Sequence, residues 1–149
     1  MHYLQKSIHV IFVVSILSLL SSCGFNNTNE TTISEKEIDF ITSLGLLEQD
    51  EQIEMFESNA GFKGYKQSGN LITDKRLASY WIEDDSQEID FEYYSSIDSL
   101  VEVDLVSKPT YASYLEVYKA DGTTFKVYID ADSTRTYNFF NKAMENWRN

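Results

Sequence analysis

The chain has 149 residues, with 24 aspartates and glutamates against 12 lysines and arginines, and its formal net charge is −12. A chain this acidic does not suit nucleic-acid binding or electrostatic docking on anionic lipid, because both need clustered lysines and arginines. It contains one cysteine and two histidines, which leaves little room for chemistry that depends on those residues.

The N-terminal segment has the pattern of a secretion signal. Residues 8–20 are almost wholly apolar, which is too short a run for a membrane-spanning helix, and two small serines follow. The sequence LSSC at residues 20–23 resembles the lipobox of bacterial lipoproteins. The resemblance implies that the thiol of Cys23 receives a diacylglycerol and that the chain is cut just before this residue.

We therefore expect a signal peptide at residues 1–22, a lipidated cysteine with a flexible tether at 23–33, and one domain at 34–149. The expected location is extracytoplasmic, with the lipid on Cys23 holding the protein to the membrane. In a bacterium with two membranes we expect the outer membrane, facing the periplasm, because Gly24 is not the aspartate that retains lipoproteins.

The expected processing removes His2 and His9 with the signal. Without histidine, and with lipid on Cys23, the mature chain has no histidine-dependent nucleophile, no histidine general base and no Cys/His zinc site. The formal net charge changes from −12 to −13, because Lys6 is the charged residue that is lost. We expect no catalytic residue, no metal and no cofactor, and hence a protein that is not an enzyme.

The segment SEKEIDFITSLG predicts a short helix over residues 35–44. Ser34 and Glu37 match a capping box, and Gly45 suits the position just after the helix. Three apolar residues recur on one face of this helix: Ile38, Ile41 and Leu44.

After this helix the apolar residues repeat with a period of two, which predicts antiparallel strands. In EIDFEYYSSI, SLVEVDLV and SYLEVYKADGTTFKVYID, apolar or aromatic residues alternate with mostly acidic ones. We expect the apolar residues to face inward and the acidic ones outward; the inward set includes Val101, Val103 and Leu105. The pair Asp121-Gly122 predicts a hairpin, and residues 52–82 predict about three further strands separated by glycines.

The chain ends in a predicted amphipathic helix, with Asp132 or Ser133 as its cap. The apolar stripe of this helix consists of Tyr137, Phe140, Met144 and Trp147. We expect the stripe to close the open end of a sheet.

Three segments are similar to parts of bacterial pleckstrin-homology and GRAM-type domains: GNLITDKRLASYWI, EIDFEYYSSIDSLVEV and LEVYKADGTTFKVYID. The order of strands followed by one helix is also that of the family, and the resemblance covers roughly residues 50–148. It implies a mainly β (α+β) fold, namely a small antiparallel β-barrel or bent sheet of six to seven strands with a capping C-terminal helix. The short N-terminal helix is an addition to the family pattern.

The same resemblance implies a scaffold that binds peptides, proteins or lipids. The lipid-binding members present a basic loop to anionic headgroups, whereas this chain offers only Lys63 and Lys66 in that region. Phosphoinositide binding is therefore not carried over.

Tyrosines are the candidate binding residues, because aromatic side chains anchor interfaces. Tyr118 and Tyr128 alternate with apolar residues and are expected to point outward, and Tyr111 and Tyr114 lie in the segment TYASY that follows Pro109. The sheet preference of tyrosine is the simpler account of the same residues.

Two acidic segments are weighed as cation sites. DADSTR, read as an EF-hand loop, lacks the required glycine and glutamate, so a helix cap is the expected role of its acids. IEDDSQE is expected to form a solvated turn, with a weak hard-cation site as the alternative.

We carry three hypotheses for function. The first is a membrane-anchored envelope lipoprotein that acts as a non-catalytic protein-binding accessory. The second is an inhibitor or immunity-type lipoprotein that neutralises a basic toxin or hydrolase. The third is small-ligand binding or an enzyme that works through carboxylates.

Overall fold

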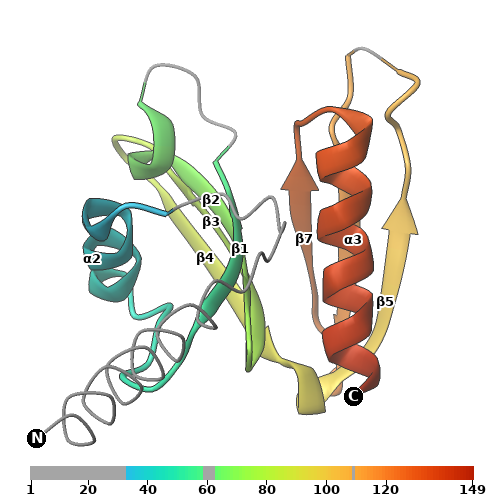
Figure 1. Ribbon diagram of the computed structural model, residues 1–149, viewed down its shortest axis with the longest axis horizontal. Coiled ribbons are helices and arrows are strands. Elements are labelled where there is room, and N and C mark those ends of the chain that lie inside the picture. The colour runs from blue at the N-terminus through green and yellow to red at the C-terminus, as the bar shows by residue number, and fades with distance from the viewer. Residues whose placement is uncertain (1–32, 59–62, 109) are drawn as a thin grey trace, which may run out of the picture.

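The computed structural model describes residues 33–58, 63–108 and 110–149. Two sheets stand next to each other, with α2 on the outer side of the first sheet and α3 packed on the second (Figure 1). The elements are α2 (Glu35–Ser43), β1 (Ile53–Glu57), η1 (Gly64–Lys66), β2 (Ser68–Thr73), β3 (Arg76–Ile82), β4 (Gln87–Tyr93), η2 (Tyr94–Ser96), β5 (Ile97–Val103), β6 (Ser113–Lys119), β7 (Thr124–Ile129) and α3 (Ser133–Arg148).

The strands form two antiparallel meanders. The first sheet has the order β1-β2-β3-β4 and the second the order β5-β6-β7. The prediction of a mainly β fold with six to seven strands, a short N-terminal helix and a C-terminal helix is confirmed, with seven strands among the described residues. Of the two finer alternatives, a small barrel or a bent sheet, the barrel is wrong, because no ladder joins the two sheets among the described residues. Each sheet buries its apolar face against the other layer and the helices instead.

The first sheet is packed on both faces, and β2 shows this most clearly because all six of its residues are buried. Neighbouring residues of a strand point to opposite faces. Leu71 belongs to a core with Ile41 and Leu46 from the α2 segment, whereas Ile72 belongs to a core with Leu115 of the second sheet. The N-terminal helix therefore acts as a third layer. Apolar residues on one face of the first sheet pack against this helix, and those on the other face pack against the second sheet.

The termini of α2 match the sequence prediction. Ser34 is the N-cap, and its backbone N–H donates to Glu37 Oε2 at 2.7 Å while Glu37 N–H donates to Ser34 Oγ at 3.4 Å. Gly45 follows the C-cap with φ +74°, a conformation that L side chains rarely adopt. A capping box and a C-terminal glycine thus set the length of the helix.

The second sheet differs from its prediction in β5. Its register with β6 shifts between Ile97 and Ser99, and a bulge of this kind reverses which residues face the core beyond it. Leu100 is buried, and Val101 is 43% exposed. The expected inward orientation of Val101 and Val103 is therefore wrong, since both lie on the outer face.

Helix α3 covers the inner face of the second sheet (Figure 1). Asp132 is its N-cap, with Oδ1 accepting from Arg135 N–H at 3.0 Å. The predicted stripe is partly wrong, because Tyr137 is 43% exposed while the buried set is Thr136, Phe139, Phe140 and Ala143. The contact face is rotated toward Phe139, which fills the space between the sheets.

No helix among the described residues is long and apolar enough to cross a membrane. The predicted lipobox, Cys23 and most of the tether lie outside the described residues.

Candidate functional site

The outer face of the second sheet carries a set of exposed and half-buried apolar and aromatic side chains. The strand register places them in rows across β5, β6 and β7. We call this surface the outer tyrosine face, and its members are Val101, Val103, Tyr114, Tyr118 and Tyr128. Tyr118 is 36% exposed and Tyr128 is 46% exposed. Three of the four predicted binding tyrosines thus share one surface.

The fourth predicted residue, Tyr111, is 66% exposed and lies in the loop just before β6 begins. One row of the face runs Val103–Tyr114–Tyr128, with the rings of Tyr114 and Tyr128 5.3 Å apart. Tyr111 stands at the end of the sheet where this row lies. The bulge in β5 adds valines to the surface, which the sequence pattern did not predict.

Charged residues interrupt the outer tyrosine face. Lys126 Nζ lies 4.6 Å from the ring centroid of Tyr114 and 4.0 Å from Glu116 Oε1. Tyr118 Oη donates to Glu116 Oε2 at 3.0 Å, and this hydrogen bond raises the pKa of Tyr118. These contacts hold the rings of Tyr114 and Tyr118 beside one carboxylate and one ammonium group, and aromatic side chains of this kind are enriched at protein interfaces.

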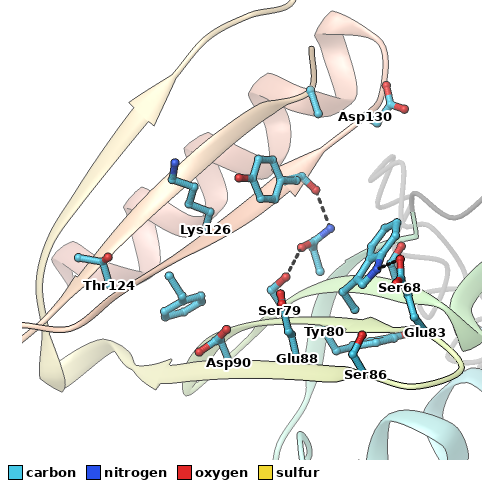
Figure 2. Close-up of a pocket in the computed structure, with 15 residues that line it drawn as sticks. Ser68, Ser79, Tyr80, Glu83, Ser86, Glu88, Asp90, Thr124, Lys126 and Asp130 are labelled. Atoms are coloured by element: carbon cyan, nitrogen blue, oxygen red, sulfur yellow. Dashed lines mark hydrogen bonds between the residues drawn. The ribbon is translucent and has the colours of Figure 1, made fainter. Parts of the chain in front are cut away.

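A second feature is a cleft of about 850 Å³ between the two sheets, which we call the inter-sheet cleft. Figure 2 shows Lys126 and Thr124 of β7 on one side and Glu88 and Asp90 of β4 on the other. The lining residues are Ser68, Asn70, Ser79, Tyr80, Trp81, Glu83, Ser86, Glu88, Asp90, Ala112, Thr124, Phe125, Lys126, Tyr128 and Asp130. The cleft therefore shares Tyr128 with the outer tyrosine face, and Lys126 lies beside both.

The cleft contains acids that the sequence pattern placed on an outward, solvated surface. In β4, Ile89 packs against the core beneath α2, so its neighbours Glu88 and Asp90 turn to the opposite face. That face looks toward the second sheet. The alternation is confirmed and Glu88 is exposed as expected, but the acidic face of β4 looks into the cleft and not into open solvent, because both faces of the first sheet are packed.

A hydrogen bond from Asn70 of β2 to Tyr128 of β7 joins the two sheets at the floor of the cleft. Ser79 Oγ donates to Asn70 Oδ1 at 2.9 Å, and Asn70 Nδ2 donates to the backbone carbonyl of Tyr128 at 2.6 Å (Figure 2). Trp81 Nε1 donates to Glu83 Oε1 at 2.9 Å. Ser68 Oγ, by contrast, is a buried polar atom with no hydrogen-bond partner in the described part of the chain.

A buried ionic cluster lies on the other face of the first sheet. The guanidinium of Arg76 bonds both carboxylate oxygens of Glu51 and also pairs with Glu48 at 2.7 Å. The rings of Phe91 and Tyr93 lie over the guanidinium, with centroids 4.9 Å and 4.5 Å from its carbon. Because every member has a partner, we assign the cluster to stability.

The acidic turn IEDDSQE joins β3 to β4. Its Asp84 pairs with Lys63 at 3.1 Å, and both side chains are exposed. Within residues 33–58, 63–108 and 110–149, no group of three or more acids, histidines or cysteines is arranged to hold a metal ion.

Comparison with known proteins yields one similarity of fold. No family profile matches the chain, and no curated protein matches it. A solved structure of a DUF1696 family protein with a pleckstrin-homology domain, from Shewanella loihica PV-4, is similar with a TM-score of 0.44 and 12% identity. The match covers 72% of this chain and 93% of that chain. It concerns fold alone and carries no information about activity.

Proposed function

We propose that this protein is a cell-envelope lipoprotein, anchored through Cys23, whose domain binds a partner protein without catalysing a reaction. The outer tyrosine face is the observation that supports the proposal. It gathers three tyrosines and two valines on one sheet surface, and Val101, Tyr118 and Tyr128 are each more than a third exposed.

The chemistry of this face suits a protein surface better than a small molecule. Tyrosine buries a large area, keeps a polar end and loses little side-chain entropy on binding. Contiguous exposed apolar area on a soluble domain commonly marks an interaction site. Because the formal net charge of the chain is −12, we propose that the partner presents a basic rim around an apolar centre.

The anchor follows from the lipobox resemblance. Two or more acyl chains on Cys23 would hold the protein stably to a membrane. The polar residues 24–33 would leave the domain free to reach a partner on the same surface.

The proposal is tested by affinity purification of C-terminally tagged, full-length protein from crosslinked envelopes. We expect one stoichiometric partner, a loss of that partner in the Tyr118→Ser/Tyr128→Ser variant, and a loss of membrane association in Cys23→Ala. Tyr137→Ser is the matched control, because Tyr137 is also exposed but lies on α3. Equal capture by the double variant and the wild type would exclude the outer tyrosine face as the docking surface.

An inhibitor or immunity-type role is the second candidate, and the acidic charge of the chain favours it. If the protein is an inhibitor, we expect a strongly basic partner and tight binding that weakens with salt. We also expect the partner enzyme to lose activity on binding. An accessory role expects a partner whose activity is unchanged. An activity assay of the purified partner, with and without this protein, separates the two.

A further inference from the structure

The inter-sheet cleft contains a buried hydroxyl that the fold leaves without a partner. Ser68 is 2% exposed, it lines the cleft, and its Oγ makes no hydrogen bond to any described residue. Buried polar atoms in native structures are nearly always hydrogen-bonded, so such an atom indicates a water molecule or a ligand. The position directly across on β3 is Trp81, the aromatic residue of the cleft that is 42% exposed.

The walls of the cleft are acidic. Glu83, Glu88, Asp90 and Asp130 face one cation, Lys126. No lysine or arginine among the described residues forms a salt bridge with Glu88, Asp90 or Asp130. Lys126 pairs with Glu116 outside the cleft instead. The electrostatic field therefore favours a positive occupant and opposes an anion.

The cleft also offers aromatic surface to an occupant. Trp81 and Phe125 contribute an indole and a phenyl ring to the lining, and aromatic faces attract organic cations. The volume of about 850 Å³ falls in the range of small-molecule sites. A bare metal ion fits poorly, because the described acids do not converge as a ligand set.

We propose that the inter-sheet cleft binds an organic cation, an ammonium or guanidinium group on a hydrocarbon body. Glu88 and Asp90 bind the cationic group of the occupant, and Trp81 packs against the hydrocarbon part. Ser68 Oγ accepts a hydrogen bond from an N–H of the cationic group. The cation comes either from a free amine or from a lysine or arginine side chain of a peptide. The cleft adjoins the outer tyrosine face and shares Tyr128 with it, but cation binding in the cleft is measured without a partner protein and with variants of other residues.

The test is a titration of the full chain followed by tryptophan emission, in a Trp147→Phe background that leaves Trp81 as the reporter. The probes are spermidine and agmatine as free cations, and acetyl-Gly-Arg-Gly-amide with acetyl-Gly-Gln-Gly-amide as its neutral counterpart. Each titration is repeated at matched ionic strength, with sodium chloride as the reference salt. We expect saturable binding of the cations and none of the neutral peptide.

Three variants locate the site. Glu88→Gln/Asp90→Asn is expected to weaken binding by about tenfold or more, because charge-assisted hydrogen bonds are lost. Asp98→Asn/Glu102→Gln is the control, since it removes the same charge from exposed positions on β5 that do not line the cleft. Ser68→Ala is expected to weaken binding without lowering Tm, because the hydroxyl that it removes has no partner to lose.

Each outcome of these titrations either supports the proposal or overturns it. Saturation by free amines identifies a small-molecule site, whereas saturation by the arginine peptide alone identifies a side chain as the source, and both support the proposal. Equal weakening in the β5 control, or a signal that sodium chloride reproduces, would show unspecific screening and overturn it. No saturable binding by any probe would assign Ser68 to a buried water and overturn it as well.

Discussion

Arg76 and Glu51 form a bidentate ion pair, with Arg76 Nε 2.8 Å from Glu51 Oε1 and Nη2 2.7 Å from Oε2. The side chain of Arg76 is 2% exposed and that of Glu51 is fully buried. Although burial opposes the charge, the hydrogen bonds to Glu51 raise the pKa of Arg76. The pair fastens the segment before β1 to the start of β3, across 25 residues of sequence.

The first prediction concerns this pair. Arg76→Met leaves the carboxylate of Glu51 buried without its main partner, and we expect the free energy of unfolding to fall by about 3–5 kcal/mol. The measurement is urea denaturation followed by circular dichroism. Lys63→Met, which breaks the exposed pair with Asp84, is the control and should cost at most about 1 kcal/mol. A loss for Arg76→Met no larger than the control would show that the pair is not needed.

The second prediction tests the contact face of α3. Phe139 is fully buried, whereas Tyr137 is 43% exposed. Phe139→Ala should cost about 3–5 kcal/mol, because it removes a buried ring and leaves a cavity. Tyr137→Ala should cost far less, and the two variants are compared by chemical denaturation. A larger loss of stability for Tyr137→Ala than for Phe139→Ala would show that α3 packs through the face predicted from the sequence.

The third prediction concerns the close approach of backbone and rings at Gly69. A Cβ at this position would stand 2.5 Å from Phe56 Cε2 and 2.5 Å from Tyr80 Oη. Both rings are buried, so Gly69→Ala should cost about 1–3 kcal/mol through overpacking. Its thermal midpoint should fall accordingly.

Gly45→Ala separates space from backbone strain, since Gly45 has φ +74° with nothing within 4 Å of an added Cβ. Its cost should be about 1–2 kcal/mol from the left-handed conformation alone. A Tyr80→Phe change should partly relieve Gly69→Ala and leave Gly45→Ala unaffected. Strict additivity in both pairs would contradict the proposed clash.

The fourth prediction is a pH dependence at the junction of α3 and β5. Tyr137 Oη donates to Asp104 Oδ2 at 2.7 Å, and with the backbone N–H of Val106 it lowers the pKa of Asp104 from its usual 3.8. A carboxyl whose pKa is lower in the folded state adds stability above its unfolded pKa. That stability is lost as the pH falls from about 4 toward the lower folded value.

Tyr137→Phe removes the larger of the two hydrogen bonds that lower this pKa. We therefore expect the variant to lose less Tm than the wild type between pH 6 and pH 3, and to be the less stable of the two at pH 6. Differential scanning calorimetry across this range measures both. Parallel curves of Tm against pH for the two proteins would show that the hydrogen bond from Tyr137 does not lower the pKa of Asp104.

Local chemistry was readable directly from the sequence. The capping box at Ser34, the cap at Asp132 and the hairpin at Asp121-Gly122 depend on neighbours within a few residues, and the structure has all three. Gly122 takes φ +85° at the turn between β6 and β7. The period-two pattern likewise identified the strands, because side-chain alternation is a property of each strand by itself.

The expectations that differ from the structure are those in which contacts between distant segments decide which way a side chain faces. The period of a strand states that its residues alternate, but it does not state which face meets the core. For Glu88 and Asp90 the answer depended on α2, which occupies the opposite face of the first sheet. For Val101 it depended on one bulge in β5.

The sequence by itself determined the class of fold, the two helices, most of the strands and the exclusion of histidine chemistry from the expected mature chain. Tertiary structure alone decided the pairing of Arg76 with Glu51, the rotation of α3 toward Phe139 and the existence of the inter-sheet cleft. The physical reason is that capping and periodicity act over a few residues. Burial and ion pairing depend on which segments meet in space, and residues far apart in sequence share those contacts.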